Sequence, residues 1–347
     1  MSETVTWSDP CDTVTTTAGV VVVEAGCATP SAVPGSPSEV IFNNAGTMDG
    51  AENVQILSQN LQLITPATAP TTASANGLVL YSQNVAGKES LYTIEDTGWA
   101  TRHQMDIGHN KVRLWNFPGS GTTANPPAWG MPNATTQGNQ QTRVFSTTNA
   151  LTASTRNSFT QATINTTRQF VGYRTAPSGN FCWRGDAATR GGFLVSIKFG
   201  IGDAVLAADG HSFFGLIASP SIPTNGTTYS PLTAINMVGI CQIEGSGNTW
   251  YWCHNDGTGT ATSVSTGVTI DLTSIYTLTI FAGPNGSSIG MRLDTTTFAG
   301  TTSVSYSTST DIPTQTSTLG FGTWRGAADS LNEVALDYLS IYAETPH

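Results

Sequence analysis

The sequence predicts an all-β protein, and three observations carry this prediction. Charged residues make up only 10% of the chain, whereas long solvated helices need Glu, Lys and Arg on their exposed face. Thr and Val are frequent and pack well in strands. The 36 glycines and 17 prolines supply turns between short apolar runs, and we find no helical period. The expected architecture is a short N-terminal β segment, a thin β shaft and a C-terminal jelly-roll, concanavalin-like β-sandwich.

Residues 1–37 form the predicted N-terminal attachment segment. The stretch "TVTTTAGVVVVEAG" is rich in β-branched residues, and "PSAVPGSPSE" reads as a linker. The first ten residues, "MSETVTWSDP", are acidic and polar, unlike a secretory signal. We expect this segment to dock to other proteins of an assembly.

Residues 38–104 form the predicted shaft. Short apolar runs alternate here with turn pairs such as Asp49-Gly50 and Asn76-Gly77. Runs of about five residues cannot bury a core alone, which favours a homotrimer whose chains share one interior. The alternative is an ordinary meander packed on the next domain.

Residues 105–347 form the predicted sandwich. Strand-length runs separated by Gly, Asn, Pro and Thr turns are typical of a sandwich or jelly roll. The last run carries Val334, Leu336, Leu339 and Ile341, so we expect it in the core. The predicted strands lie at 191–202, 211–219, 235–245, 248–256, 267–272, 276–286, 288–298, 317–324 and 333–344.

Charge and cysteine content restrict the partners. A net charge of −10 and a pI near 4.8 argue against nucleic acid, which needs a basic surface. No run of about 18 apolar residues predicts a membrane span. The cysteines could be buried free thiols, or some could form disulfides after release from the cell, with Cys11 and Cys27 bracketing one short segment. The other three are Cys182, Cys241 and Cys253.

Several motifs resemble a family of bacteriophage tail-fibre and virion structural proteins with a C-terminal jelly-roll, lectin-like domain. The resemblance covers about residues 38–347 and implies a structural role in the virion, with no catalytic site. Its motifs are "SEVIFNNAGTMDGAENVQI" (38–56), "ANGLVLYSQNVAGKESLYTIEDTGW" (75–99), "GHNKVRLWNFPG" (108–119), "FCWRGDAATRGGFLVSIKFGIGDA" (181–204) and "ALDYLSIYAET" (335–345).

The tripeptide Arg-Gly-Asp at 184–186 raises the question of cell adhesion. A second segment, "WRGAADS" at 324–330, repeats Trp-Arg-Gly without the Asp in register. A shared structural role is simpler: Trp183 and Trp324 each close one end of the sandwich, while Arg184 and Arg325 pack or pair.

No residue pattern predicts catalysis, a metal or a cofactor. Glu333 and Asp337 are the nearest approach to a glycosidase carboxylate pair, but an ion pair of Asp337 with Arg325 or Arg292 is the better interpretation. The histidines are not spaced for a metal site or a catalytic triad, and the Asn/Asp-Gly stretches read as turns.

A saccharide site is the binding hypothesis with most chemical content. In "NTWYWCHND" (248–256), Trp250 and Trp252 share one strand face and Tyr251 lies on the other. If they are exposed at a rim, four residues could stack on a sugar ring and bind its hydroxyls. They are Tyr251, His254, Asn255 and Asp256.

The sequence therefore predicts a virion protein made in the bacterial cytoplasm. We expect a homotrimeric fibre of the tail, head or neck that contacts the host surface, with a host glycan as a candidate ligand. Two alternatives stay open: a capsid or collar decoration protein without receptor binding, and a glycan-cleaving tail enzyme.

Overall fold

A computed structural model describes the chain in part. The described residues are 4–6, 13–17, 20–24, 39–44, 47–57, 60–63, 69–71, 73, 75, 77–98, 100–103, 111–116, 128–129, 134–141, 143–162, 168–175, 179–206, 210–219, 223, 233–327 and 333–345. Cys11 and Cys27 lie outside them. The chain divides into two compact units, Met1–Asn84 with Glu89–Met105, and Val85–Lys88 with Asp106–His347. The predicted segments 1–37, 38–104 and 105–347 stay a prediction.

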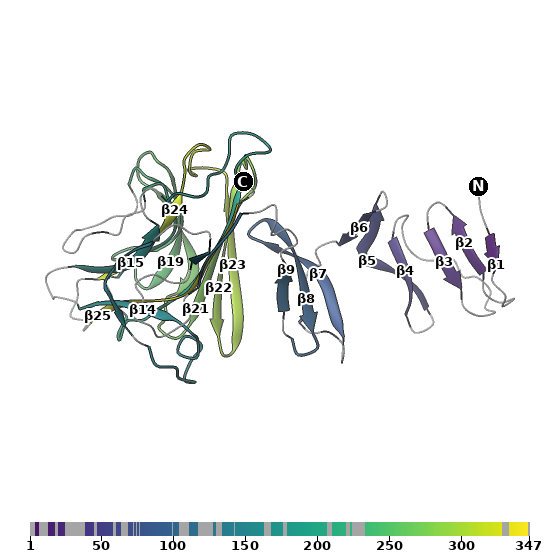
Figure 1. Cartoon of the computed structure of the whole chain (residues 1–347), viewed down its shortest axis with the longest axis horizontal. Coiled ribbons are helices and arrows are strands. Elements are labelled where there is room, and N and C mark those ends of the chain that lie inside the picture. The colour runs from purple at the N-terminus through teal and green to yellow at the C-terminus, as the bar shows by residue number, and fades with distance from the viewer. Residues whose placement is uncertain are drawn as a thin grey trace. The chain divides into compact units, whose positions relative to one another are not determined.

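Three small antiparallel sheets follow one another in the N-terminal part, and each joins only consecutive strands (Figure 1). They are β1 (Thr4–Thr6), β2 (Thr13–Thr17) and β3 (Val20–Glu24); β4 (Glu39–Asn44), β5 (Thr47–Leu57) and β6 (Asn60–Leu63); and β7 (Leu78–Val85), β8 (Lys88–Glu95) and β9 (Ala100–His103).

Two larger sheets then pack face to face, so the predicted all-β sandwich is confirmed. One runs β11 (Ala128–Trp129), β10 (Lys111–Asn116), β25 (Glu333–Thr345), β16 (Phe193–Ile201), β21 (Ile275–Ala282), β22 (Ile289–Thr297), β23 (Gly300–Thr308), with β14 (Asn157–Ala162) beside β25 and β13 (Asn139–Gln141) beside β14. The other runs β12 (Ala134–Gln137), β15 (Gln169–Thr175), β24 (Gly320–Ala327), β17 (His211–Ile217), β18 (Asn236–Gln242), β19 (Thr249–Asp256), β20 (Thr262–Thr269).

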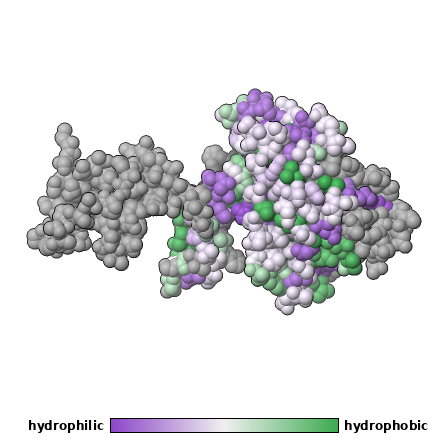
Figure 2. Space-filling view, turned by 180° about the vertical axis from the view of Figure 1, so that it is seen from behind, coloured by the Kyte–Doolittle hydropathy of each residue, from purple (hydrophilic) through white to green (hydrophobic). Residues whose placement is uncertain are grey.

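The core lies between these sheets because apolar side chains alternate along each strand. Val195, Ile197 and Phe199 of β16 face Phe214 and Leu216 of β17 in one buried cluster. The Phe199 and Phe214 rings stack with their centroids 3.8 Å apart. The outer surface is different: Figure 2 shows mostly near-neutral and hydrophilic residues on the sandwich, with separate apolar patches.

The last strand, β25, is central, as its apolar residues suggest, but its alternation is broken by a β-bulge. Tyr338 pairs with Phe199 and Ser340 pairs with Lys198, so Leu339 is an extra residue without a partner in β16. Leu339 therefore packs in a separate small cluster rather than with Leu336 and its neighbours.

His211, at the start of β17, makes stability depend on pH. Burial and the positive charge of Arg168 lower its pKa to about 4, against the opposing effect of Glu244. The unfolded chain, with a His pKa near 6.5, therefore binds a proton between about pH 6.5 and 4 that the folded chain does not. We expect the free energy of unfolding to fall by about 2 kcal/mol from pH 7 to 4.5.

Urea unfolding at the two pH values, for the wild type and for His211→Gln, measures this effect. The loss on acidification should shrink in the variant. Equal losses in both proteins would show that another group causes the acid sensitivity.

Candidate functional site

Strand β19 carries the residues of the predicted saccharide site, and it turns alternate side chains to opposite faces. Trp250 and Trp252 enter the core, where the Trp250 ring meets Phe199 and Phe214 edge-on at 5.8 and 5.5 Å. Tyr251 lies on the outer face and is half-buried. The two tryptophans therefore stabilise the sandwich and are not available to stack on a ligand.

His254 follows on the inner face and is fully buried, which corrects its predicted place at an exposed rim. Its Nδ1 lies 2.9 Å from the carbonyl oxygen of Asp311 and its Nε2 lies 3.2 Å from the hydroxyl of Tyr306. The Tyr306 ring stacks on it at 5.8 Å. The imidazole joins β19 to β23 and cannot reach a sugar in solution.

Asn255 is also buried, and this again differs from the predicted rim. Its side-chain oxygen accepts bonds from the backbone NH groups of Gly257 and Thr258, at 2.8 and 3.1 Å, which forms an Asx turn. Asp256 is half-buried, and its bonds to Thr258 lower the pKa of its carboxyl. Of the four predicted residues, Tyr251 and Asp256 reach solvent.

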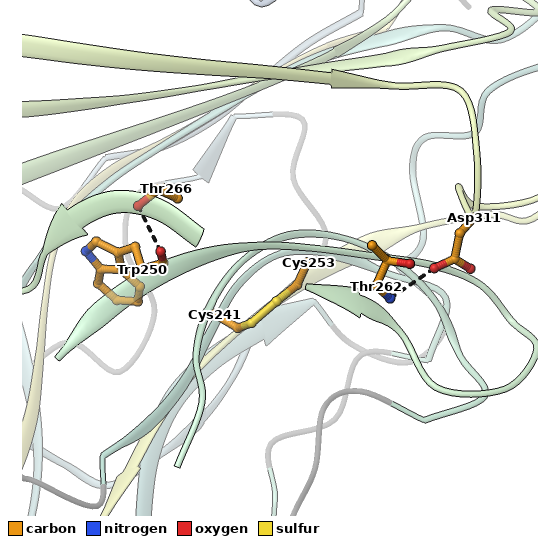
Figure 3. Close-up of a disulfide and its surroundings, with 6 residues drawn as sticks. All are labelled: Cys241, Trp250, Cys253, Thr262, Thr266 and Asp311. Carbon is orange, nitrogen blue, oxygen red and sulfur yellow. Dashed lines mark hydrogen bonds between the residues drawn. A yellow bond between two sulfur atoms is a disulfide. The ribbon is translucent and has the colours of Figure 1, made fainter. Parts of the chain in front are cut away.

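Asp311 organises this corner, although sequence reasoning missed it. Its carboxylate accepts the backbone NH of Asp256 at 3.2 Å and that of Thr262 at 3.0 Å (Figure 3). Its own backbone is left-handed, with φ of 52°. Asp311 is far from β19 in sequence and lies in no recognisable motif, so no local signal could have identified it.

A disulfide joins Cys241 of β18 to Cys253 of β19 beside this corner (Figure 3). The two alternatives for the cysteines thus both occur, since Cys182 is a buried free thiol. Both bonded cysteines face outward from the sandwich core, in a buried cluster with Phe213 and Trp324. The bond links neighbouring strands below the Asn255 turn.

The Arg-Gly-Asp segment forms a tight turn whose arginine is buried. Arg184 donates to the carbonyl oxygens of Pro313, at 2.6 Å, and Gly286. Gly185 has φ of 95°, and a Cβ there would lie 1.7 Å from the carbonyl oxygen of Arg190. The Arg184 guanidinium is therefore not displayed as an adhesive tripeptide requires.

The second Trp-Arg-Gly segment is buried in β24. Trp324 packs on Phe213 with ring centroids 4.9 Å apart, and Arg325 pairs with Asp203. Trp183 is half-buried, and its segment lies beside the chain that leads into β24, through the bridge from Cys182 to Leu319. Both arginines hold distant backbone or side-chain groups.

Exchanging Asp186 for Ala should leave stability within about 0.5 kcal/mol of the wild type and host adsorption unchanged. The aspartate is exposed and bonds only Arg190, four residues on, at 3.0 Å. Arg184→Ala should cost about 1–3 kcal/mol because two buried carbonyls lose their donor. Thermal unfolding and cell adsorption of both variants test this; adsorption lost in a folded Asp186→Ala chain would restore the adhesive interpretation.

Asp337 is buried and does not pair with Arg325 or Arg292, as predicted. Its carboxylate binds Arg156 Nε at 2.8 Å, with Arg143 at 3.7 Å. Arg325 binds Asp203 instead, and Arg292 binds Asp294. Register explains the difference, since Asp337 faces outward from the sandwich while Arg325 points inward. A carboxylate held this way is unsuited to act on a glycan.

The described residues contain no group of three or more His, Cys, Asp or Glu that could hold a metal ion. They also contain no helix long and apolar enough to cross a membrane. The polar corner of β19 is thus a rigid, hydrogen-bonded turn with one ionised carboxylate at its surface.

Comparison with protein families finds no match, and comparison with curated proteins finds none either. Three solved structures share the fold distantly. A protein of unknown function from Shewanella oneidensis has 11% identity and a TM-score of 0.44, covering 70% of this chain and 90% of its own. The Emp47p carbohydrate recognition domain has 12% and 0.41 (67% and 93%). Lectin II from Ulex europaeus has 17% and 0.43 (67% and 97%).

Proposed function

We propose that this chain is a structural protein of a bacteriophage particle, a fibre that projects from the tail, head or neck and contacts the host surface. The supporting observation is the order of its parts. Three sheets of three short strands precede one large sandwich. A three-stranded sheet encloses no core of its own, whereas the sandwich does. This order suits a thin shaft that carries a globular head.

The exposed leucines of β7 support a homotrimer. Leu78 and Leu80 lie on one face of the strand and are 63% and 49% exposed. Tyr81, on the other face, is covered by the stacked ring of Tyr92 at 5.5 Å. Further copies of the same sheet would cover the leucines and form a shared interior. Residues 1–37 then attach the trimer to other virion proteins.

The sandwich is the proposed host-contacting part, and a cell-surface saccharide is its proposed ligand. Its surface offers hydroxyl groups on the exposed strands β20 and β23, and Asp256 adds a carboxylate with a lowered pKa. Such groups bind sugar hydroxyls by direct hydrogen bonds. The fixed turn around Asn255 limits the entropy lost on binding.

Adsorption of the fluorescently labelled chain to a panel of bacterial strains tests this proposal. We expect binding to a subset of strains, and loss of binding after periodate has oxidised the vicinal diols of surface glycans. A chain that binds no strain would contradict the proposal and favour a decoration protein. Release of reducing sugars from bound cells would favour a glycan-cleaving enzyme.

A further inference from the structure

The outward face of the nine-stranded sheet is polar across five neighbouring strands. Val195, Ile197, Leu278 and Leu293 point into the core, so the residues between them point away from it. We call this outward surface the hydroxyl face. Its members are Ser196, Lys198, Thr277, Thr279, Arg292, Asp294, Ser303, Ser305, Ser340 and Tyr342.

Strand register arranges the hydroxyl face in two rows, each crossing β25, β16, β21, β22 and β23. The strand spacing of about 4.8 Å gives each row a length of about 19 Å, which suits several units of a linear sugar chain. One row is Ser340, Lys198, Thr277, Asp294 and Ser303, and the other is Tyr342, Ser196, Thr279, Arg292 and Ser305.

Lys198 is the uncompensated charge on this face. Arg292 binds Asp294 at 2.7 Å and Ser303 at 3.0 Å, so these two charges cancel. Glu344, farther along β25, is neutralised by Lys88 at 2.7 Å. Lys198 is half-buried and has no ion pair among the described residues. It leaves one positive charge on a chain whose net charge is −10.

We propose that the hydroxyl face binds an anionic saccharide, a sugar chain that carries carboxylates. The Lys198 ammonium binds a carboxylate, and Ser340 and Thr277, directly opposite it on both neighbouring strands, bind ring hydroxyls. Tyr342 lies diagonal to Lys198 and offers a ring to an apolar sugar face. A nucleic acid would require several cations where this face has one.

This inference rests on the proposed function, because it names the class of saccharide that the sandwich binds. Calorimetric titration of the full chain with polygalacturonate, alginate and hyaluronate tests it, with neutral dextran for comparison. We expect at least one acidic polymer to bind, more weakly at about 300 mM than at about 20 mM salt, because salt screens the exposed charge.

Lys198→Gln should weaken this binding at least about tenfold, since a charge-assisted hydrogen bond is lost. Thr277→Glu should weaken it as well, because the new carboxylate lies opposite Lys198. Arg190→Gln is the matched control: it removes one positive charge from an exposed side chain outside the hydroxyl face. Its affinity should stay within about twofold of the wild type.

Two results would overturn the inference: no binding of any acidic polymer, or a folded Lys198→Gln chain that binds as tightly as the wild type. Cell adsorption separates this failure from that of the proposed function. If Lys198→Gln adsorbs to cells like the wild type in a periodate-sensitive way, the fibre proposal stands and the hydroxyl face is wrong. If the wild type adsorbs to no strain, the fibre proposal fails while the titrations still judge the hydroxyl face.

Discussion

Asp203→Asn is expected to lower the free energy of unfolding by about 3–5 kcal/mol, because it leaves a buried guanidinium without its counter-charge. The Arg325 side chain is fully buried and donates from Nε to Asp203 at 2.8 Å. Asp203 also accepts the backbone NH of Ala335 at 2.8 Å. One carboxylate thus connects β24, the segment after β16 and β25. Urea denaturation at pH 7 measures the loss.

Asp294→Asn provides the matched control, since Asp294 pairs with Arg292 at the surface and both are partly exposed. Solvent screens that pair, so its loss should cost less than about 1 kcal/mol. Similar small losses for both variants would show that Arg325 is relieved by water or by its other partners, Gln242 and Ser212.

Trp250→Ala is expected to cost about 3–5 kcal/mol, the range for removal of a large buried aromatic side chain. Trp250 is fully buried, and its ring contacts Phe199, Phe214 and Tyr276. Its loss opens a cavity that neighbours from both sheets cannot fill without moving. Thermal and urea unfolding measure the effect.

Tyr251→Ala is the comparison variant, because Tyr251 is the next residue, faces outward and is half-buried. It should cost clearly less than Trp250→Ala, since less of its surface leaves water on folding. A Trp250→Ala chain of unchanged stability that had lost saccharide binding would contradict the core assignment and return Trp250 to the binding site.

Alternation of apolar residues identified the strands with cores on one side. The runs at 191–202, 276–286 and 333–344 correspond to β16, β21 and β25. β23 was missed because "GTTSVSYST" buries little of itself at the sheet edge, and only Val304 and Tyr306 pack inward. The run at 267–272 was misplaced, since β20 ends at Thr269 and Ile270 turns into the core after it.

The candidate site was harder to predict because its partners are distant in sequence. The local pattern placed Trp250 and Tyr251 on opposite faces correctly. It could not place His254, whose burial depends on Asp311 and Tyr306 of a different sheet edge. The same limit applied to Asp337, whose partner Arg156 lies 181 residues away. Alternation predicts which face a side chain takes, whereas pairing depends on the fold.

The native mass of the full chain, measured by light scattering with and without residues 1–37, tests the fibre account most directly. Each chain has a mass of 36.3 kDa, and the account predicts three chains per particle in both forms. That result would place the shared interior within the remaining shaft, where Leu78 and Leu80 are exposed. A monomer in both forms would contradict the account and leave a single-copy binding module.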